Sequence, residues 1–251
     1  RLDYLTPPPK PSDLPAILNA PGLDVIATCR PLREGGKFTG TETDRLAILQ
    51  AAAEAGANFI DVEADVPETD RPDGTIISSR HDFETCPADL AEQVAEMEAS
   101  SAAINKIAFT ASNPADAFKA FDVIRESRKP TLALAMGEAG LPSRILAGKF
   151  GAFGTFAALA DGLESAPGQP TITELRDLYR WDAINEDTEL YGVIGCPVGH
   201  SMSPAIHNAA FTAAGINAAY VPLLIEPGAE DFNRFLDAVL ARPQLNWRGL
   251  S

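Results

Sequence analysis

The sequence predicts an α/β protein in which a (β/α)8 TIM barrel that lacks its first units is followed by the start of a second α/β domain. Six short apolar runs alternate with segments of helical spacing, which favours a parallel sheet with crossover helices. The runs are almost continuously apolar, as in strands that are covered on both faces or closed into a barrel. The expected strands are residues 24–28, 58–63, 75–79, 106–110, 131–136 and 152–157.

Helical spacing recurs between these runs, and the expected helices are residues 43–56, 87–101, 115–127 and 143–149. A complete barrel has eight βα units, so the count predicts that the first unit and most of the second are absent. In such barrels the functional groups lie at the carboxyl ends of the strands. Polar or pocket-forming residues near the expected strand ends favour a barrel over an open sheet, and they are Arg30, Glu63, His81, Lys106 and Met136.

The character of the chain changes at residues 182–189, a short acidic stretch that is typical of a linker. Beyond it the pattern predicts a strand at 191–195, a turn-rich loop, a helix that starts near Pro204 and a strand at 219–225. We therefore expect a barrel domain over residues 1–181 and a second domain over 190–251. The second segment is too short to close a domain of typical size.

The composition limits the classes of partner. The 251 residues include 35 acidic and 20 basic side chains, and the net charge of −15 argues against a nucleic-acid or anionic-membrane surface. No apolar run approaches the roughly 20 residues of a membrane span. The three cysteines are far apart, which favours a reducing compartment and no metal site. The cytoplasm is the expected location, or a plastid if a transit peptide precedes Arg1, since the chain opens without a methionine and reads as a piece of a longer protein.

Lys106 lies inside an apolar run, Ile104-Asn105-Lys106-Ile107-Ala108-Phe109. Burial there disfavours the charged form and makes a neutral amine available, which can condense with a ketone to form a Schiff base. His81 ends the preceding expected strand, so the pair suggests carbonyl chemistry with proton abstraction beside the carbonyl. A lysine that snorkels at a strand edge is the alternative interpretation.

Two loops supply further polar groups. Arg30 can hold a carboxylate bidentately, and Glu34 can accept a hydrogen bond from His81 and set its tautomer. A polar surface loop with a Gly-Gly turn is the alternative for this segment. Later in the chain, Arg144 offers a guanidinium, Ser165 a hydroxyl and Gln169 an amide. Each is an ordinary loop residue by itself. Together with Arg30 they form a set of hydrogen-bond donors for a polyhydroxylated carboxylate.

Together these segments resemble type I 3-dehydroquinate dehydratases over roughly residues 1–180. The segments are Cys29-Arg30-Pro31, Glu34-Gly35-Gly36, Ile60-Asp61-Val62-Glu63, Ser79-Arg80-His81-Asp82-Phe83, Lys106-Ile107-Ala108, Ser143-Arg144 and Ser165-Ala166-Pro167-Gly168-Gln169. The resemblance implies that Lys106 forms an imine with the substrate ketone. It also implies that His81 removes the C2 proton and later protonates the departing hydroxyl, with Glu34 orienting the ring. No metal or diffusible cofactor is implied for this dehydration.

The resemblance further assigns the substrate-binding positions. These are Arg30, Arg144, Ser165 and Gln169, with Met136 as a wall of the pocket. Arg1 matches the arginine of a Glu-x-Arg pair in the family, whose glutamate is absent from this sequence.

The segment that runs from Tyr191 to Asn208 resembles the N-terminal signature of shikimate dehydrogenase. The resemblance implies that Ser201 and Ser203 bind a substrate carboxylate and that NADP is bound by a domain beyond this chain. It implies no metal role for His200 or His207. The product of the first reaction, 3-dehydroshikimate, would be the ketone that the second domain reduces to shikimate.

Two other interpretations remain open. One is another Schiff-base barrel enzyme such as an aldolase, against which the Ser-Ala-Pro-Gly-Gln segment in place of a phosphate-binding glycine loop argues. The other is a catalytically inactive piece with a binding or assembly role. The expected partners are small-molecule substrates, and a homodimer is an oligomeric state that the sequence leaves open.

Overall fold

The computed structural model describes residues 1–19 and 22–251. By its internal contacts it divides into two compact units. The first compact unit comprises Arg1–Phe83, Asp89–Ile107 and Arg128–Pro130, and the second comprises Glu84–Ala88, Ala108–Ser127 and Thr131–Ser251. Each unit is described below by itself.

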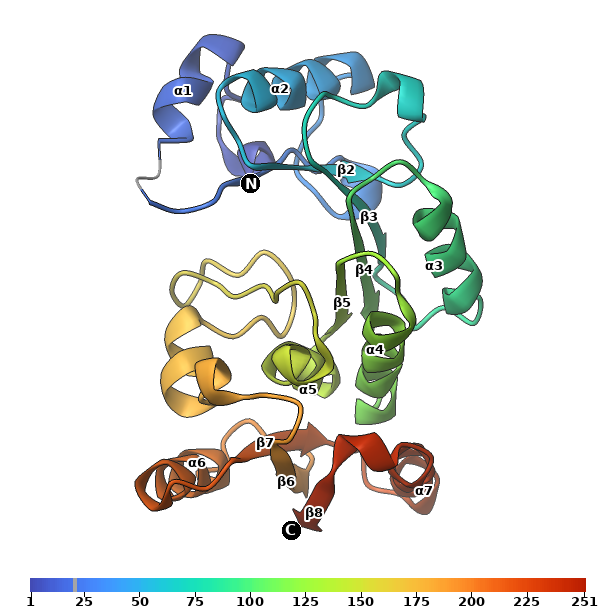
Figure 1. The fold of residues 1–251 in the computed structure, drawn as a ribbon, viewed down its shortest axis with the longest axis vertical. Helices are drawn as coiled ribbons and strands as arrows, with labels where there is room; N and C mark the ends of the chain where they lie inside the picture. The colour runs from blue at the N-terminus through green and yellow to red at the C-terminus, as the bar shows by residue number, and fades with distance from the viewer. Residues whose placement is uncertain (20–21) are drawn as a thin grey trace. The chain divides into compact units, whose positions relative to one another are not determined.

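A parallel sheet of five strands confirms the predicted α/β class. The strands follow one another in the sheet in their order along the chain, as successive strands of a barrel do (Figure 1). They are β1 (Ile26–Thr28), β2 (Phe59–Glu63), β3 (Ile76–Asp82), β4 (Ile104–Thr110) and β5 (Thr131–Met136). Within the first compact unit the parallel register places Thr28 opposite Asp61 and Glu63 opposite Ser79.

The helices that accompany these strands are α1 (Leu14–Ile17), α2 (Glu42–Glu54), α3 (Leu90–Ala99), α4 (Pro114–Glu126) and α5 (Leu141–Ile145). Helices α2, α3 and α4 connect the strands near the expected positions, whereas α1 precedes β1 and was not predicted, and α5 follows β5. Helix α2 begins where the Thr41 side chain accepts a hydrogen bond from the Asp44 backbone N–H, at 3.1 Å. Asn113 and Asp116 form a capping box at the start of α4. Buried apolar residues of α2 and β2 belong to one core cluster, which places polar residues of β2 on the opposite face.

The strand expected at residues 152–157 is wrong. No named strand covers these described residues. Phe153 N–H donates to Thr131 O at 3.0 Å, and an isolated bridge follows between Ala158 and Thr171. Gly151, at φ +79°, and Gly154 explain the difference, because glycine weakens a strand by its conformational entropy and its lack of a packing side chain. The helix expected at 143–149 is shorter, since α5 passes into a 3-10 turn that ends at Gly151.

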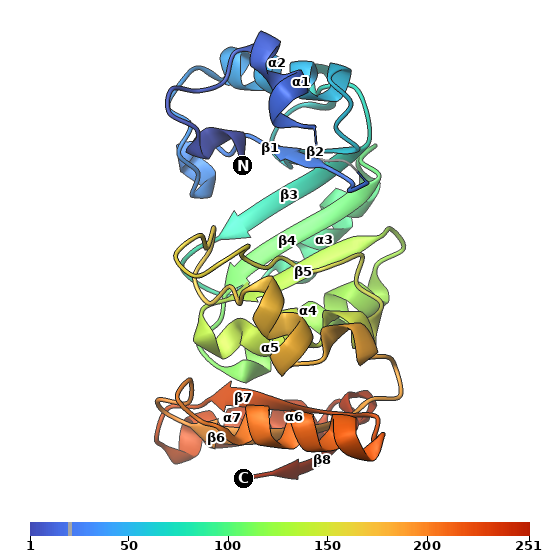
Figure 2. The same ribbon diagram turned by 90° about the vertical axis from the view of Figure 1, so that its left-hand side faces the viewer.

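The carboxyl-terminal part of the second compact unit holds a separate sheet of three parallel strands in the order β7-β6-β8. The strands are β6 (Glu189–Gly195), β7 (Ala218–Leu224) and β8 (Trp247–Leu250), and the helices are α6 (Ser203–Ala214) and α7 (Ala229–Leu240). Figure 2 shows α6 lying along the sheet. The predicted strand-helix-strand start is confirmed, whereas α7 and β8 were not predicted. None of the helices among the described residues has the length and apolar character that a bilayer crossing requires.

Candidate active site

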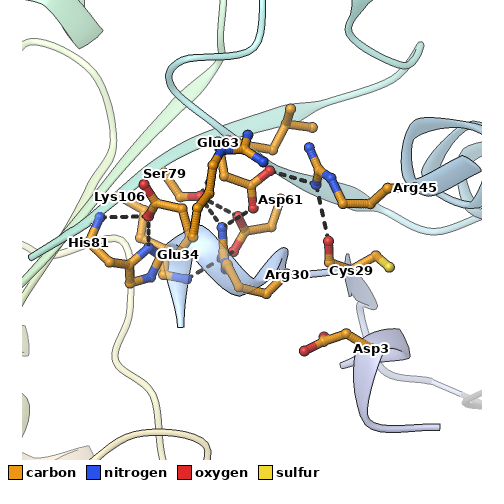
Figure 3. A network of polar contacts seen from close by, with 12 residues as sticks. Asp3, Cys29, Arg30, Glu34, Arg45, Asp61, Glu63, Ser79, His81 and Lys106 are labelled. Carbon is orange, nitrogen blue, oxygen red and sulfur yellow. Dashed lines mark hydrogen bonds and ion pairs between the residues drawn. The ribbon is translucent and has the colours of Figure 1, made fainter. Parts of the chain in front are cut away.

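Polar side chains gather on one face of the first compact unit, beside the ends of β1, β2 and β3 (Figure 3). Asp61 and Glu63 alternate with apolar residues along β2, so their side chains share a face. Ser79 and His81 repeat the pattern on β3, and Lys106 joins them from β4. The sheet thus brings together residues that are far apart along the chain.

Lys106 is only 7% exposed, and its Nζ donates a hydrogen bond to Asp61 Oδ2 at 2.9 Å. Burial lowers the pKa of this amine to about 8, although the Asp61 carboxylate opposes the shift, and the Arg30 charge lowers the pKa further. At pH 7.5 roughly a quarter of such an amine is neutral, against about one part in a thousand at the ordinary pKa of 10.5. The alternative of a lysine that snorkels at a strand edge is therefore wrong.

His81 and Glu34 are in direct contact. His81 Nδ1 lies 2.8 Å from Glu34 Oε2, and the same oxygen accepts a hydrogen bond from the His81 backbone N–H at 3.0 Å. Burial lowers the pKa of His81 well below 6.5, and the charges of Lys106 and Arg30 act in the same direction. Burial also raises the pKa of Glu34 to about 7. The imidazole is therefore neutral at physiological pH, as a general base must be.

Steric crowding explains why two glycines follow Glu34. Gly35 adopts φ +70°, and a Cβ there would lie 2.3 Å from the Phe83 ring. A Cβ on Gly36 would lie 1.9 Å from the Arg30 carbonyl oxygen. Only glycine allows this close return of the chain. The turn holds Glu34 over β3 and is a structural part of the site, in contrast to the surface-loop alternative.

Arg30 is almost completely buried, and protein groups engage both of its terminal nitrogens. Nη1 donates to Glu63 Oε1 and Ser79 Oγ, both at 2.6 Å, and Nη2 donates to Asp61 Oδ2 at 2.7 Å. Asp61 and Glu63 engage these donors, and the contact of Arg30 with a substrate carboxylate stays a prediction. Arg30 also holds the carboxylate that contacts Lys106.

Sequence reasoning assigned no role to Asp61, Ser79 or Arg45. Arg45 is fully buried, and its Nη1 lies 2.5 Å from Glu63 Oε2 and donates to Cys29 O at 3.0 Å. The sequence did hold a signal for these partners, because Asp61 and Glu63 lie two positions apart in an expected buried strand. Buried carboxylates need cationic or hydrogen-bonding partners.

Arg1 also lies in the first compact unit. Its Nε and Nη2 donate to the two carboxylate oxygens of Asp3, at 2.8 and 2.7 Å. The positive charge of Arg1 contributes to lowering the pKa of Lys106. The expected substrate-binding arginine is thus paired with Asp3, and its influence on Lys106 is electrostatic.

In the second compact unit, Arg144 of α5 is 1% exposed. Its Nη1 donates a long hydrogen bond to Phe156 O, at 3.3 Å, whereas Nε is buried without a partner. No ion pair joins Arg144 to a carboxylate within residues 1–19 and 22–251. Burial alone lowers its pKa to about 10. A buried guanidinium without a counter-ion is a site that an anion can complete.

The other residues predicted in this unit lie around the end of β5. Gln169 Oε1 accepts hydrogen bonds from the Ser165 backbone N–H, at 2.8 Å, and from Ser165 Oγ, at 3.1 Å. Gly137, directly after β5, donates its N–H to Pro167 O at 3.1 Å, which ties this loop to the strand. Met136 is buried in an apolar cluster whose other members are Ala108, Leu134, Phe156 and Ala166.

The two serines expected in the second domain lie where α6 begins, and the Ser203 backbone N–H donates to Ser201 Oγ at 3.3 Å. Asn208 fastens this helix to β7 by exchanging two hydrogen bonds with the Tyr220 backbone, at 2.9 and 2.8 Å. Within the described parts of the chain, no cluster of three or more His, Cys, Asp or Glu side chains could hold a metal ion.

Two family models match the chain. The model described as type I 3-dehydroquinase matches residues 1–186, and the model of the shikimate dehydrogenase substrate binding domain matches residues 193–251. These matches confirm both resemblances seen in the sequence.

Curated relatives agree with the family models. The bifunctional 3-dehydroquinate dehydratase/shikimate dehydrogenase, chloroplastic, of Arabidopsis thaliana is 42% identical over 236 residues, which are 90% of this chain and 39% of that protein. The 3-dehydroquinate dehydratase of Desulfotalea psychrophila is 37% identical over 194 residues, covering 71% of this chain and 84% of that protein. This chain therefore spans about two fifths of the Arabidopsis relative and most of the Desulfotalea one.

Solved structures share the fold. The 3-dehydroquinate dehydratase of Geobacillus kaustophilus aligns with a TM-score of 0.57 at 27% identity, covering 66% of this chain and 70% of that one. The dehydroquinate dehydratase and shikimate dehydrogenase of S. pombe aligns with a TM-score of 0.58 at 23% identity, covering 94% of this chain and 49% of that one. On the sequence, the fold and these matches, the chain belongs to the type I 3-dehydroquinase family.

Proposed function

We propose that this chain dehydrates 3-dehydroquinate to 3-dehydroshikimate through a Schiff base on Lys106. The observation that carries the proposal is the buried amine of Lys106, whose pKa is lowered to about 8 beside the contacting pair of His81 and Glu34. A neutral amine attacks the substrate ketone, the ketone oxygen leaves as water, and the resulting iminium draws electrons from the neighbouring carbon. The iminium thereby acidifies the C2 proton.

His81 then acts as general base and general acid. An ionised Glu34 accepts a hydrogen bond from the Nδ1–H group, which leaves the Nε2 lone pair free to remove the C2 proton. The carbanion is stabilised as an enamine, and its electrons expel the hydroxyl group, to which His81 returns its proton. Hydrolysis of the imine releases the product and restores the amine of Lys106.

Four further residues are proposed for substrate recognition. Arg144 binds the substrate carboxylate, which is the counter-ion that its buried guanidinium lacks. Ser165 and Gln169 bind substrate hydroxyls, and Met136 forms an apolar wall. Arg30 and Arg1 are also proposed to bind substrate, and their carboxylate partners hold both side chains in place.

For domain organisation we propose a dehydratase domain over residues 1–181, a linker over 182–189 and the start of a shikimate dehydrogenase substrate-binding domain over 190–251. Ser201 and Ser203 bind the substrate carboxylate in the second domain. The turn between β6 and α6 contains Pro197, and Pro204 follows in the first turn of α6. This is not a glycine-rich dinucleotide-binding turn, so no described residue there fits NADP. We assign this chain no step that involves NADP.

The substrates are small molecules, and a homodimer remains a prediction. The cytoplasm is the compartment that we propose from the sequence. A plastid is the alternative, because the Arabidopsis relative carries the word chloroplastic in its name.

Reductive trapping tests the proposed function. Cyanoborohydride with 3-dehydroquinate is expected to leave a covalent adduct on Lys106, located by peptide mass spectrometry, and Lys106→Ala should abolish it. Lys149→Arg is the matched control, because Lys149 is equally buried but donates to the carbonyl oxygens of Glu186 and Thr188. Absence of the adduct from the unaltered chain would refute the proposal, and cleavage of phosphorylated sugars without dehydration would favour the aldolase.

A further inference from the structure

Lys106 is the first member of a buried series of side chains whose charges alternate in sign. Each member contacts the next at 2.9 Å or less, with successive distances of 2.9, 2.7, 2.6, 2.5 and 2.5 Å. We call this series the charge ladder, and its members in order are Lys106, Asp61, Arg30, Glu63, Arg45 and Glu42. Figure 3 labels every member except Glu42, which lies at the exposed end.

Asp61 is the member that contacts Lys106, and it is held from three sides. Its Oδ2 accepts from both Lys106 Nζ and Arg30 Nη2, and its Oδ1 accepts from Ser79 Oγ at 2.6 Å. The side chain is completely buried. Burial favours the neutral acid, but the charges of Arg30 and Lys106 outweigh it and hold the pKa of Asp61 well below its usual range. Asp61 is thus a fixed anion.

The contacts of Asp61 favour a cation on the Lys106 nitrogen. Asp61 Oδ2 lies 2.9 Å from Lys106 Nζ, and Arg30, the other cation that contacts Asp61, is shared with Glu63. A fixed buried anion without sufficient positive charge beside it is costly, so this arrangement favours a positive charge on the nitrogen.

A cation forms on this nitrogen during the proposed reaction. The neutral amine and the ketone, with one proton, give an iminium and one water, in which the nitrogen keeps one proton and carries the positive charge. We propose that Asp61 is a positioning residue that aims the Lys106 amine and serves as the fixed counter-ion of the cationic imine. This inference rests on the proposed function and names the group that stabilises its covalent intermediate.

The charged groups around Lys106 act in opposite directions on its pKa. Arg30 and Arg1 lower it, whereas Asp61 raises it against the effect of burial. The neighbouring His81 is neutral, because its own pKa is low. Replacing Asp61 by asparagine removes the opposing charge and keeps the shape of the side chain. The pKa of Lys106 should then fall below its present value of about 8.

The first measurement is the pH dependence of Lys106 acylation by acetic anhydride, quantified by peptide mass spectrometry, which reads the pKa without substrate. Asp61→Asn is expected to move the midpoint by at least about one pH unit to the acid side. Arg30→Gln should move it to the alkaline side, because it removes a like charge. Glu96→Gln, the same chemical change at an exposed carboxylate, should leave it in place.

The second measurement is cyanoborohydride trapping with 3-dehydroquinate at a pH above both midpoints. Asp61→Asn should lower the steady-state amount of trapped imine by roughly tenfold or more, since the cation has lost its counter-ion. A purely structural role would reduce folded protein but would not shift an acylation midpoint. If Asp61→Asn does not fold, an acid or absent shift in Arg30→Gln overturns the inference.

The outcomes separate this inference from the proposed function. Trapping in the unaltered chain together with an unmoved midpoint in Asp61→Asn overturns the counter-ion role and leaves the Schiff base standing. Failure to trap any imine in the unaltered chain overturns both. An acid shift in Asp61→Asn, an alkaline shift in Arg30→Gln and reduced trapping in Asp61→Asn support the inference.

Discussion

Replacing Arg144 by methionine is expected to stabilise the fold while removing substrate binding. Arg144 is a buried cation whose pKa is lowered by burial from 12.5 to about 10. A lowered pKa in a cation means that the folded state disfavours the charge, and this cost is fully present at any pH below the folded pKa. The shift corresponds to a cost of about 3 kcal/mol at 1.36 kcal/mol per pKa unit.

The substitution also removes the hydrogen bond from Arg144 to Phe156 O, which at 3.3 Å is worth about 1 kcal/mol at most. The free energy of unfolding should therefore rise by about 1–2 kcal/mol. Urea unfolding at neutral pH measures this change. Tryptophan fluorescence is a suitable signal, because Trp181 Nε1 donates to the Arg144 backbone oxygen at 3.2 Å.

Arg45→Met is the matched control. Arg45 is as deeply buried as Arg144 but is paired with Glu63 and Glu42, so its removal leaves the buried Oε2 of Glu63 without its cationic partner. It should destabilise the fold by about 3–5 kcal/mol. The two substitutions remove the same charged group and are predicted to have opposite signs. A loss of stability in Arg144→Met similar to that in Arg45→Met would refute the reasoning.

Binding provides the second half of this test. 3-Dehydroquinate should raise the midpoint of thermal unfolding of the unaltered chain, because a ligand that binds only the folded state stabilises it by mass action. The same concentration should raise the midpoint of Arg144→Met little or not at all. An equal rise in both proteins would show that Arg144 does not bind the substrate carboxylate.

Three further predictions concern the pH dependence of the reaction, the packing of α7 against α4 and the loop that contains Gly168. The rate constant kcat/KM should rise from roughly pH 6 to pH 9. Ionisation of Glu34 near pH 7 and deprotonation of Lys106 near pH 8 both produce the reactive forms. A flat pH profile would contradict these assignments. Arg242, just beyond α7, forms a bidentate pair with Asp122 of α4 at 2.6–3.2 Å. A double-mutant cycle in urea on this pair should yield a coupling energy of about 1 kcal/mol, and zero coupling would show that the pair does not fasten the end of α7. Gly168→Ala should lower the free energy of unfolding by about 1–3 kcal/mol and weaken substrate binding in the thermal assay. The reason is that φ is +69° and the new Cβ would lie 2.5 Å from the backbone oxygen of Gly137. An unchanged free energy of unfolding would show that the loop is not constrained there.

The strands of the large sheet could be predicted because each is a short, nearly continuous apolar run between helical segments. The expected strand at residues 152–157 was wrong, since an apolar run that contains Gly154 and follows Gly151 has the hydrophobicity of a strand without its backbone preference. Helix α7 and β8 were missed. Their packing partners lie in α4, as in the contact of Phe235 with Phe118, and that contact spans 117 positions of the chain.

The candidate site was predictable where a residue contradicted its surroundings. A lysine in an apolar run and a histidine at the end of a strand are such residues, and Lys106 and His81 do lie in one buried cluster. Asp61 and Arg45 were missed because a carboxylate in a strand and an arginine in an amphipathic helix are unremarkable in isolation. The protein partners of Arg30 could not be predicted either, because Asp61, Glu63 and Ser79 lie more than 30 positions away along the chain.

The amino-acid sequence by itself determined the alternation of strands and helices, the family and the burial of Lys106, since all three follow from local patterns of apolar and polar residues. Only the tertiary structure decided which charges are paired. Arg30 contacts Asp61 from 31 positions away and Lys106 contacts it from 45, whereas Arg144 has no carboxylate beside it among the described residues. Electrostatic energy depends on distance through space, and the folded sheet sets that distance.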